Sequence, residues 1–194
     1  MCGRYALYTE NKVKKKFNIQ IKANYNITPN SRVLVLNNEL YPEFMKWGIA
    51  PSWTKNKVNI INARSETLQE KAYFKNSLRC IFIADGYYEW KKDKGYKRPF
   101  YHFQKKHFLF FAGIYHINRG CCIVTKQSHF NISYIHHRQP LLLEESDIKN
   151  WINGKYSTKN NNFDLTVYEV SNEVNNPMNN GKSTINPISD NILF

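Results

Sequence analysis

The sequence contains no long hydrophobic run. Across its 194 residues, no segment approaches the about 20 apolar residues that a membrane-spanning helix needs. The N-terminal stretch MCGRYALYTENKVKKKF also lacks the apolar core of a secretory signal peptide. We therefore expect no membrane association and an intracellular location, in the cytoplasm or at the nucleoid, or in the nucleus if the source is a eukaryote.

Cysteine is scarce, and its spacing does not indicate a disulfide framework or a zinc site. The cysteines form no CxxC pair and stand at four positions: Cys2, Cys80, Cys121 and Cys122. Side chains of adjacent residues in a strand point to opposite faces, so the neighbouring pair is not expected to act together. Neither a Gly-rich phosphate loop nor a GxSxG motif is present. We therefore predict no metal and no cofactor.

Acidic residues are few. The chain has 15 Asp and Glu against 28 Lys and Arg, which leaves a formal charge of +13. Such an excess favours a polyanionic partner. The 13 Tyr, 12 Phe and 4 Trp residues add rings on which bases can stack, so the composition favours single-stranded nucleic acid. A basic binding module without chemistry of its own is the alternative.

Short apolar and aromatic runs recur along the chain and alternate irregularly with a few helical patterns. Strands are predicted in the stretches 4–9, 32–37, 40–47, 79–84, 98–103, 107–115, 121–125, 140–143 and 164–170. Helices are predicted in 9–17, 65–74 and 144–152, with Thr9 and Ser65 as N-cap residues of the first two. The pattern favours an α+β fold: one domain over 1–194, with a barrel-like, mostly antiparallel sheet flanked by a few helices. A monomer is expected.

The N-terminus has a chemically distinctive residue, Cys2. If Met1 is removed, Cys2 presents an α-amine and a thiol on neighbouring carbons. The amine has a pKa of about 7.7–8.0, so roughly a tenth of it is neutral at pH 7, and the thiol is a strong nucleophile. Such a pair suits an aldehyde, because the amine forms an imine on which the thiol closes to a thiazolidine. The alternative is a cysteine that is only buried in the fold.

Two further stretches contain polar residues of types that serve in chemistry. In INARSE, the polar side chains of Asn62, Arg64 and Glu66 alternate. Arg64 is suited to hold phosphate and Asn62 to hydrogen-bond a reacting group, although a helix-capping turn explains the same pattern. In ADGYYEW, Glu89 stands among aromatic residues that can raise a carboxyl pKa, as an acid or base requires. The alternative is a carboxylate on the polar face of a strand.

The stretch IHHRQP carries a third group of polar residues. His136 or His137 could act as a general acid, and Arg138 could bind phosphate. A histidine with a purely structural role is the alternative. Neither histidine has a recognised zinc spacing to the cysteines.

Taken together, these stretches resemble the SRAP family (SOS-response-associated peptidase fold), which shields abasic sites in single-stranded DNA by crosslinking to them. The resemblance rests on seven motifs in the family's order: MCGRY, NYNITP, KWGIAPSW, NARSE, RCIFIADGYYEW, FFAGIY and IHHRQP. The later VYEVSNEVNNP is a weaker match to the family's closing strand. The partner implied is single-stranded DNA with abasic sites, and junctions with duplex DNA stay open as a further substrate.

The resemblance also implies a role for each matching residue. Cys2, after removal of Met1, would form the thiazolidine with the ring-opened deoxyribose. Asn62 would orient the sugar or the Cys2 amine, Glu89 would be the acid or base and assist release of Met1, and His136 would assist opening of the sugar ring and reversal. The DNA contacts implied are phosphate clamps and stacking residues: Arg4, Arg64 and Arg138, with Pro29, Trp53 and Trp90.

The sequence departs from the family pattern in two respects. Gln139 stands where the family usually has Met, and the loops around 91–98 and 116–121 are short. A different class also fits the first residues, because glutamine amidotransferases, which are N-terminal-nucleophile amidohydrolases, begin with MCG as well. The small size, the positive charge and the NARSE and YEW motifs argue against that class. Peptidase activity is expected only as self-processing of Met1.

Overall fold

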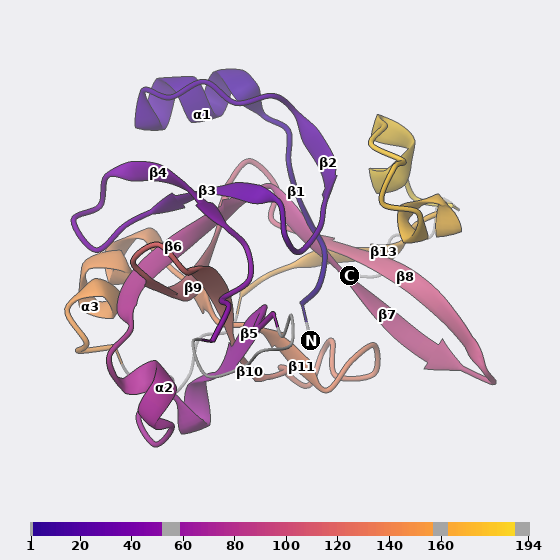
Figure 1. Ribbon diagram of the computed structural model, residues 1–194. Helices are drawn as coiled ribbons and strands as arrows, with labels where there is room; N and C mark the ends of the chain where they lie inside the picture. Colours follow the sequence, from indigo (N-terminus) through magenta and orange to yellow (C-terminus); the bar gives the residue numbers. More distant parts are fainter. Residues whose placement is uncertain (1, 52–58, 157–162, 189–194) are drawn as a thin grey trace.

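The computed structural model describes residues 2–51, 59–156 and 163–188, and all structural statements refer to them. Two groups of strands form the body of the molecule, and Figure 1 draws β7 and β8 to the right of β3, β4 and β6. No described helix is long and apolar enough to cross a membrane.

The first sheet has five strands. Its order is β13 (Thr166–Glu169), β8 (Tyr96–Phe103), β7 (Gly86–Asp93), β1 (Tyr5–Leu7) and β2 (Asn24–Ile27). All of its pairs are antiparallel, and the long hairpin β7–β8 projects from the body (Figure 1).

The second sheet has eight strands. Its path runs through β11 (Arg138–Pro140), β10 (Gly120–Gln127), β9 (Leu109–His116), β6 (Leu78–Ala84), β3 (Arg32–Leu36) and β4 (Pro42–Lys46). Two strands lie off this path: β12 (Leu142–Leu143) pairs with β9, and β5 (Asn62–Arg64) pairs with β10. Only β5–β10 is parallel among these strand pairs. The predicted α+β class with a mostly antiparallel sheet is confirmed, although the described strands form two open sheets and no closed barrel.

The helices are short and lie around the sheets. They are α1 (Glu10–Phe17), α2 (Ala72–Lys75) and α3 (Ile148–Ile152), with 3-10 turns at Ser65–Thr67, Glu145–Asp147, Asn172–Asn175 and Lys182–Ile185. The predicted helix over 65–74 is therefore divided into a 3-10 turn and α2. Thr9 is the N-cap residue of α1, but its hydroxyl donates to Asp85 Oδ1 (2.7 Å) rather than accepting from the helix.

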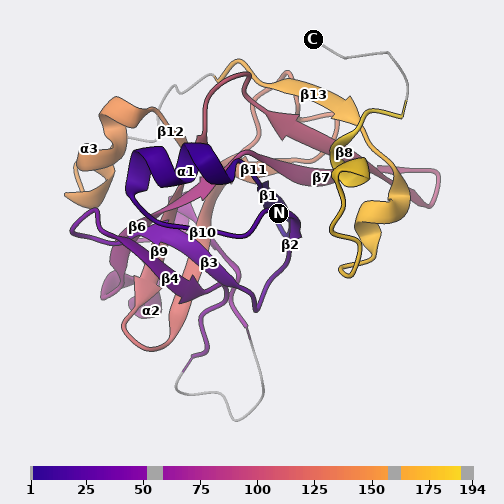
Figure 2. The ribbon, with the colours of Figure 1, turned by 90° about the horizontal axis from the view of Figure 1, so that it is seen from above.

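Aromatic side chains from both sheets fill the core between them. The ring of Tyr5 in β1 lies 5.3 Å from Trp47 and 5.9 Å from Phe111, and Tyr87 in β7 also packs edge-on against Phe111. Tyr5 and Tyr87 are direct partners across the β1–β7 pair. Because β1 enters this core so close to the start of the chain, Cys2 is buried as well, whereas Gly3 and Arg4 between Cys2 and β1 are half-buried. Figure 2 shows the N-terminal end of the chain beside β1 and β2.

Candidate active site

Cys2 lies against the core at the start of β1. The residue is fully buried, and its thiol Sγ lies 3.8 Å from the carbonyl oxygen of Arg4. Burial raises the pKa of the Cys2 thiol, and the nearby negative charge of Glu89 raises it further. The thiol is therefore kept protonated in this environment, and a neighbouring base is needed before it can react as a thiolate.

Asn62 fixes the backbone of Cys2. The parallel pairing of β5 with β10 sets Asn62 opposite Ile123, and its side-chain Nδ2 donates a 2.8 Å hydrogen bond to the Cys2 carbonyl oxygen. The Oδ1 atom of the same amide is buried and accepts no hydrogen bond. The described structure therefore places one predicted site residue directly on another and leaves an acceptor beside them.

Glu89 is buried, with 4% of its surface exposed, on β7. Burial raises the pKa of the Glu89 carboxyl. Tyr87, two residues earlier, shares the same face of the strand and is completely buried. The interpretation of Glu89 as a surface carboxylate is therefore wrong, and its environment suits an acid or base.

His136 lies near the end of the loop between β10 and β11. Its ring stacks on that of His137 with 4.5 Å between centroids. The Arg138 backbone N–H lies 3.0 Å from His136 Nδ1, and the Arg138 carbonyl oxygen lies 3.1 Å away. With its proton on Nε2, the His136 ring accepts a hydrogen bond from the Arg138 N–H. With its proton on Nδ1, the ring donates to the Arg138 carbonyl oxygen. Burial and the neighbouring positive charges lower the pKa of His136, so its neutral form predominates at pH 7.

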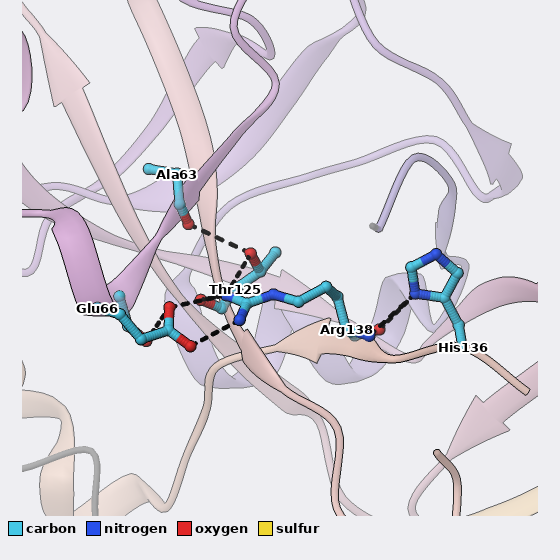
Figure 3. A network of polar contacts seen from close by, with 6 residues as sticks. Ala63, Glu66, Thr125, His136 and Arg138 are labelled. Carbon is cyan, nitrogen blue, oxygen red and sulfur yellow. Dashed lines mark hydrogen bonds and ion pairs between the residues drawn. The ribbon is translucent and has the colours of Figure 1, made fainter. Parts of the chain in front are cut away.

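Arg138 is buried and engaged within the protein. Figure 3 shows its guanidinium between Glu66 and Thr125. The two terminal nitrogens donate to the two Glu66 carboxylate oxygens at 2.6 and 2.9 Å, and one also donates to the Thr125 carbonyl oxygen at 2.6 Å. These hydrogen bonds are the main cause that lowers the Glu66 pKa to about 2. The pair joins the turn after β5 to β10 and β11, and so supports the strand that carries Asn62.

Two other predicted DNA contacts also have protein partners. One terminal nitrogen of Arg4 donates to Asn26 Oδ1 (2.6 Å) and to the Val174 carbonyl oxygen (2.7 Å). Its guanidinium carbon lies 5.9 Å from the ring centre of Trp90. The indole N–H of Trp90 donates to Asn175 Oδ1 at 2.7 Å. Arg4 and Trp90 therefore hold the C-terminal segment against the first sheet, and their predicted DNA contacts stay predictions.

The remaining predicted contacts differ in accessibility. Arg64 is exposed at the end of β5, two residues after Asn62, and so faces solvent next to the buried site. Pro29 is half-buried in the turn after β2. Trp53 lies outside the described residues.

Sequence patterns did not reveal every residue that builds the site. The sequence indicates Glu66 only as a polar residue of NARSE, yet Glu66 binds Arg138, and no sequence pattern indicates Thr125. The alternation of Asn62, Arg64 and Glu66 was the available signal for Glu66. Among the described residues, no three His, Cys, Asp or Glu side chains are grouped to hold a metal ion.

Comparison with known proteins identifies the family. The family model described as "SOS response associated peptidase (SRAP)" matches residues 1–177. The chain belongs to the SRAP family. The match contains Cys2, Asn62, Glu89 and His136, while the predicted extent of the domain to residue 194 stays a prediction.

Several SRAP relatives carry the name "Abasic site processing protein". YoqW of Bacillus subtilis is 33% identical, over 95% of this chain and 99% of its own length. YedK of Escherichia coli is 31% identical over 84% of each chain, and HMCES of Xenopus tropicalis is 29% identical over 70% of this chain and 54% of its own. A crystal structure of a Bacteroides thetaiotaomicron protein shares the fold, with a TM-score of 0.80 at 20% identity over 96% of this chain and 99% of that one.

Proposed function

We propose that this SRAP protein processes abasic sites in DNA by forming a covalent thiazolidine between Cys2, after removal of Met1, and the ring-opened deoxyribose. The main support is the hydrogen bond from Asn62 to the Cys2 carbonyl beside the buried Glu89. The names of the relatives support the substrate, since they are called abasic site processing proteins.

The reaction proceeds in three steps. His136 assists the proton transfers that open the deoxyribose hemiacetal to its aldehyde. The neutral Cys2 amine then adds to the aldehyde carbon, and Glu89 donates the proton with which the hydroxyl leaves as water, which gives the protonated imine. Finally the Cys2 thiol returns a proton to the Glu89 carboxylate while its sulfur bonds to the imine carbon, which leaves a neutral thiazolidine nitrogen. The product therefore contains the atoms of one aldehyde and one aminothiol less one water molecule.

The buried site explains why each group is needed. The Cys2 thiol has a raised pKa and reacts well only if a base takes its proton, and Glu89 becomes such a base after it has donated to the leaving hydroxyl. Ring closure is intramolecular, which replaces an encounter in solution by a high effective concentration. Asn62 holds the Cys2 backbone and thereby limits the positions of its amine.

The remaining surface supports binding to single-stranded DNA. The charge of +13 and the exposed Arg64 beside the site attract the phosphate backbone. Pro29, Trp53 and Trp90 would supply apolar and stacking faces, and Arg4 and Arg138 would reach phosphate only by exchanging protein partners. We further propose that the protein is an intracellular monomer that acts on single strands and their junctions with duplex DNA, and that Glu89 assists hydrolysis of the Met1 peptide bond.

A crosslinking assay tests the proposal. The processed protein is incubated with single-stranded DNA that carries one abasic site, then analysed on a denaturing gel and by intact mass. We expect a stable adduct whose mass equals protein plus DNA minus one water. The adduct should be absent with undamaged DNA, with Cys2→Ala, and with one extra residue before Cys2, which removes the α-amine from that residue.

The same assay separates the alternatives. An adduct that persists in Cys2→Ala would contradict the assignment of the nucleophile. Salt-dependent binding without an adduct would favour a non-covalent binding module. Hydrolysis of glutamine without an adduct would favour an N-terminal-nucleophile amidohydrolase.

A further inference from the structure

A cavity adjoins the loop that carries His136, a residue of the proposed active site. It has a volume of about 330 Å³ and is formed by the loop between β10 and β11 and by the segment that leads into β13. Two strongly exposed aromatic rings line it, Phe130 (77% exposed) and Tyr134 (46%). The volume falls within the range of small-molecule sites, and exposed aromatic rings at a cavity favour a flat ligand.

Gln139 gives this cavity a directed hydrogen-bond donor. The side chain lines the cavity and is 3% exposed. Its Oε1 accepts from the His129 backbone N–H at 2.7 Å, which fixes the orientation of the amide and turns its NH2 group away from that N–H. Within the described part of the chain, no acceptor is bonded to that NH2 group.

The lining itself carries no cation. None of the described lining residues is Lys or Arg, and Asp164 adds a carboxylate at the exposed edge. The interior of the cavity therefore suits a neutral group better than an anion. A neutral heteroaromatic ring with one acceptor for Gln139 and one amino group for Asp164 fits all of these features. Nucleobases that carry an amino group have this combination.

The cavity and the proposed site draw on neighbouring residues of the chain, Gln139 in β11 and His136 just before it. Gln139 follows His136 by three residues, which limits the distance between their Cα atoms to about 11 Å. Successive side chains of β11 point to opposite faces, so Gln139 faces the cavity while Arg138 faces Glu66. Lys91 Nζ lies 5.4 Å from the centre of the Tyr134 ring and supplies a cation for a backbone phosphate at the edge of the cavity. Figure 1 draws the β10–β11 connection on the side of the molecule where the N-terminus lies.

We infer that this cavity is a nucleobase subsite, which holds the base of a nucleotide that neighbours the abasic nucleotide between Phe130 and Tyr134, with a hydrogen bond from Gln139. The inference rests on the proposed function for the position of the lesion. The subsite itself depends on binding alone, so the two can be tested separately.

Binding to a lesion analogue without an aldehyde tests the subsite. The probe is a labelled single-stranded oligonucleotide with one tetrahydrofuran abasic analogue, which cannot form a crosslink. In a set of such probes, each flanking nucleotide in turn is replaced by a second tetrahydrofuran, and Kd is measured by fluorescence anisotropy at fixed salt. The proteins are the unsubstituted chain, Phe130→Ala, Tyr134→Ala and Gln139→Met, with Tyr41→Ala, an exposed ring (65%) on the turn between β3 and β4, as the matched control.

The Kd should depend on the presence of a base at one of the flanking positions. Removal of that base should raise Kd at least about fivefold for the unsubstituted chain and for Tyr41→Ala, as expected for loss of a stacked base. The same removal should have little effect in Phe130→Ala and Tyr134→Ala, and a reduced effect in Gln139→Met. Equal effects of base removal in all proteins, or none at any flanking position, would overturn the inference. Base-dependent binding without a crosslink to a true abasic site would support the subsite and contradict the covalent function.

Discussion

The side-chain amide of Asn62 donates a hydrogen bond to the carbonyl oxygen of Cys2, across 60 positions of sequence. The two residues belong to different parts of the fold, since Asn62 lies in the parallel pair β5–β10 and Cys2 precedes β1. The first sheet therefore supplies the nucleophile and Glu89, while the second supplies the residue that orients the nucleophile. Changes that loosen the contact between the sheets should reduce reactivity even where Cys2 itself is unchanged.

Replacement of Asn62 by Ala should slow crosslinking without preventing it. A neutral hydrogen bond contributes about 0.5–1.5 kcal/mol, so we expect a rate reduced roughly two- to tenfold. The measurement is the time course of adduct formation on a denaturing gel. Asn150→Ala, an exposed asparagine in α3, is the matched control and should react at the unsubstituted rate. An unchanged rate in Asn62→Ala would remove the orienting role.

Replacement of Glu89 by Gln should stabilise the fold and reduce the reaction. The folded-state pKa of Glu89 lies above its ordinary value of about 4.3. Between these two pKa values the folded chain keeps a proton on Glu89 that the unfolded chain has lost. Stability from this group is thus complete below about pH 4.3 and is lost as pH rises through the folded pKa. Glu89→Gln should therefore unfold at a higher temperature at pH 7.5 and at a similar temperature at pH 4.

The reaction provides the second readout for Glu89. Loss of an acid or base typically costs about 100-fold or more in rate, and Glu39→Gln, an exposed glutamate, is the control. If Glu89→Gln crosslinks at the unsubstituted rate, Glu89 has no proton-transfer role, whatever its effect on stability.

Much of the strand pattern and part of the site could be predicted from local sequence. Apolar runs such as RVLVL and FFAGIY identify β3 and β9 because their side chains are buried and β-branched or aromatic. Strands β2 and β5 were missed because NYNI and NAR are short and polar, and only pairing with distant strands makes them strands.

The partners of the predicted arginines could not be derived from local patterns. Arg138 meets Glu66 across 72 positions, and Arg4 meets Val174 across 170. A periodic pattern reports which face of an element is buried, but the choice of ion-pair partner is decided by sheet order. For this reason the sequence indicated phosphate contacts at arginines that the fold also uses for its own packing.

His102 should make the fold sensitive to acid. The side chain is buried, its ring is stacked 4.5 Å from that of Tyr87, and burial lowers its pKa to about 3. Between pH 6.5 and 3 the unfolded chain binds a proton at this residue that the folded chain does not, so stability falls as pH falls through that window. His102→Phe keeps a flat ring and should reduce the loss of unfolding free energy between pH 6.5 and 4.5. Denaturant titrations at both pH values measure it, with exposed His107→Phe as the control; an identical pH dependence in His102→Phe would contradict the prediction.

Arg64 and Arg138 should respond differently to the same substitution. Arg64 is exposed beside the site, so Arg64→Gln should weaken binding to single-stranded DNA and lower the slope of log affinity against log salt by about 1, with an unchanged Tm. Arg138 is buried and bonded to Glu66 and Thr125, so Arg138→Gln should lower Tm, because it removes the donor to the carbonyl oxygen of the buried Thr125. Fluorescence anisotropy across a salt series and thermal unfolding are measured on both proteins. A Tm loss in Arg64→Gln, or an unchanged Tm with a reduced salt slope in Arg138→Gln, would reverse the assignment and make Arg138 the phosphate contact.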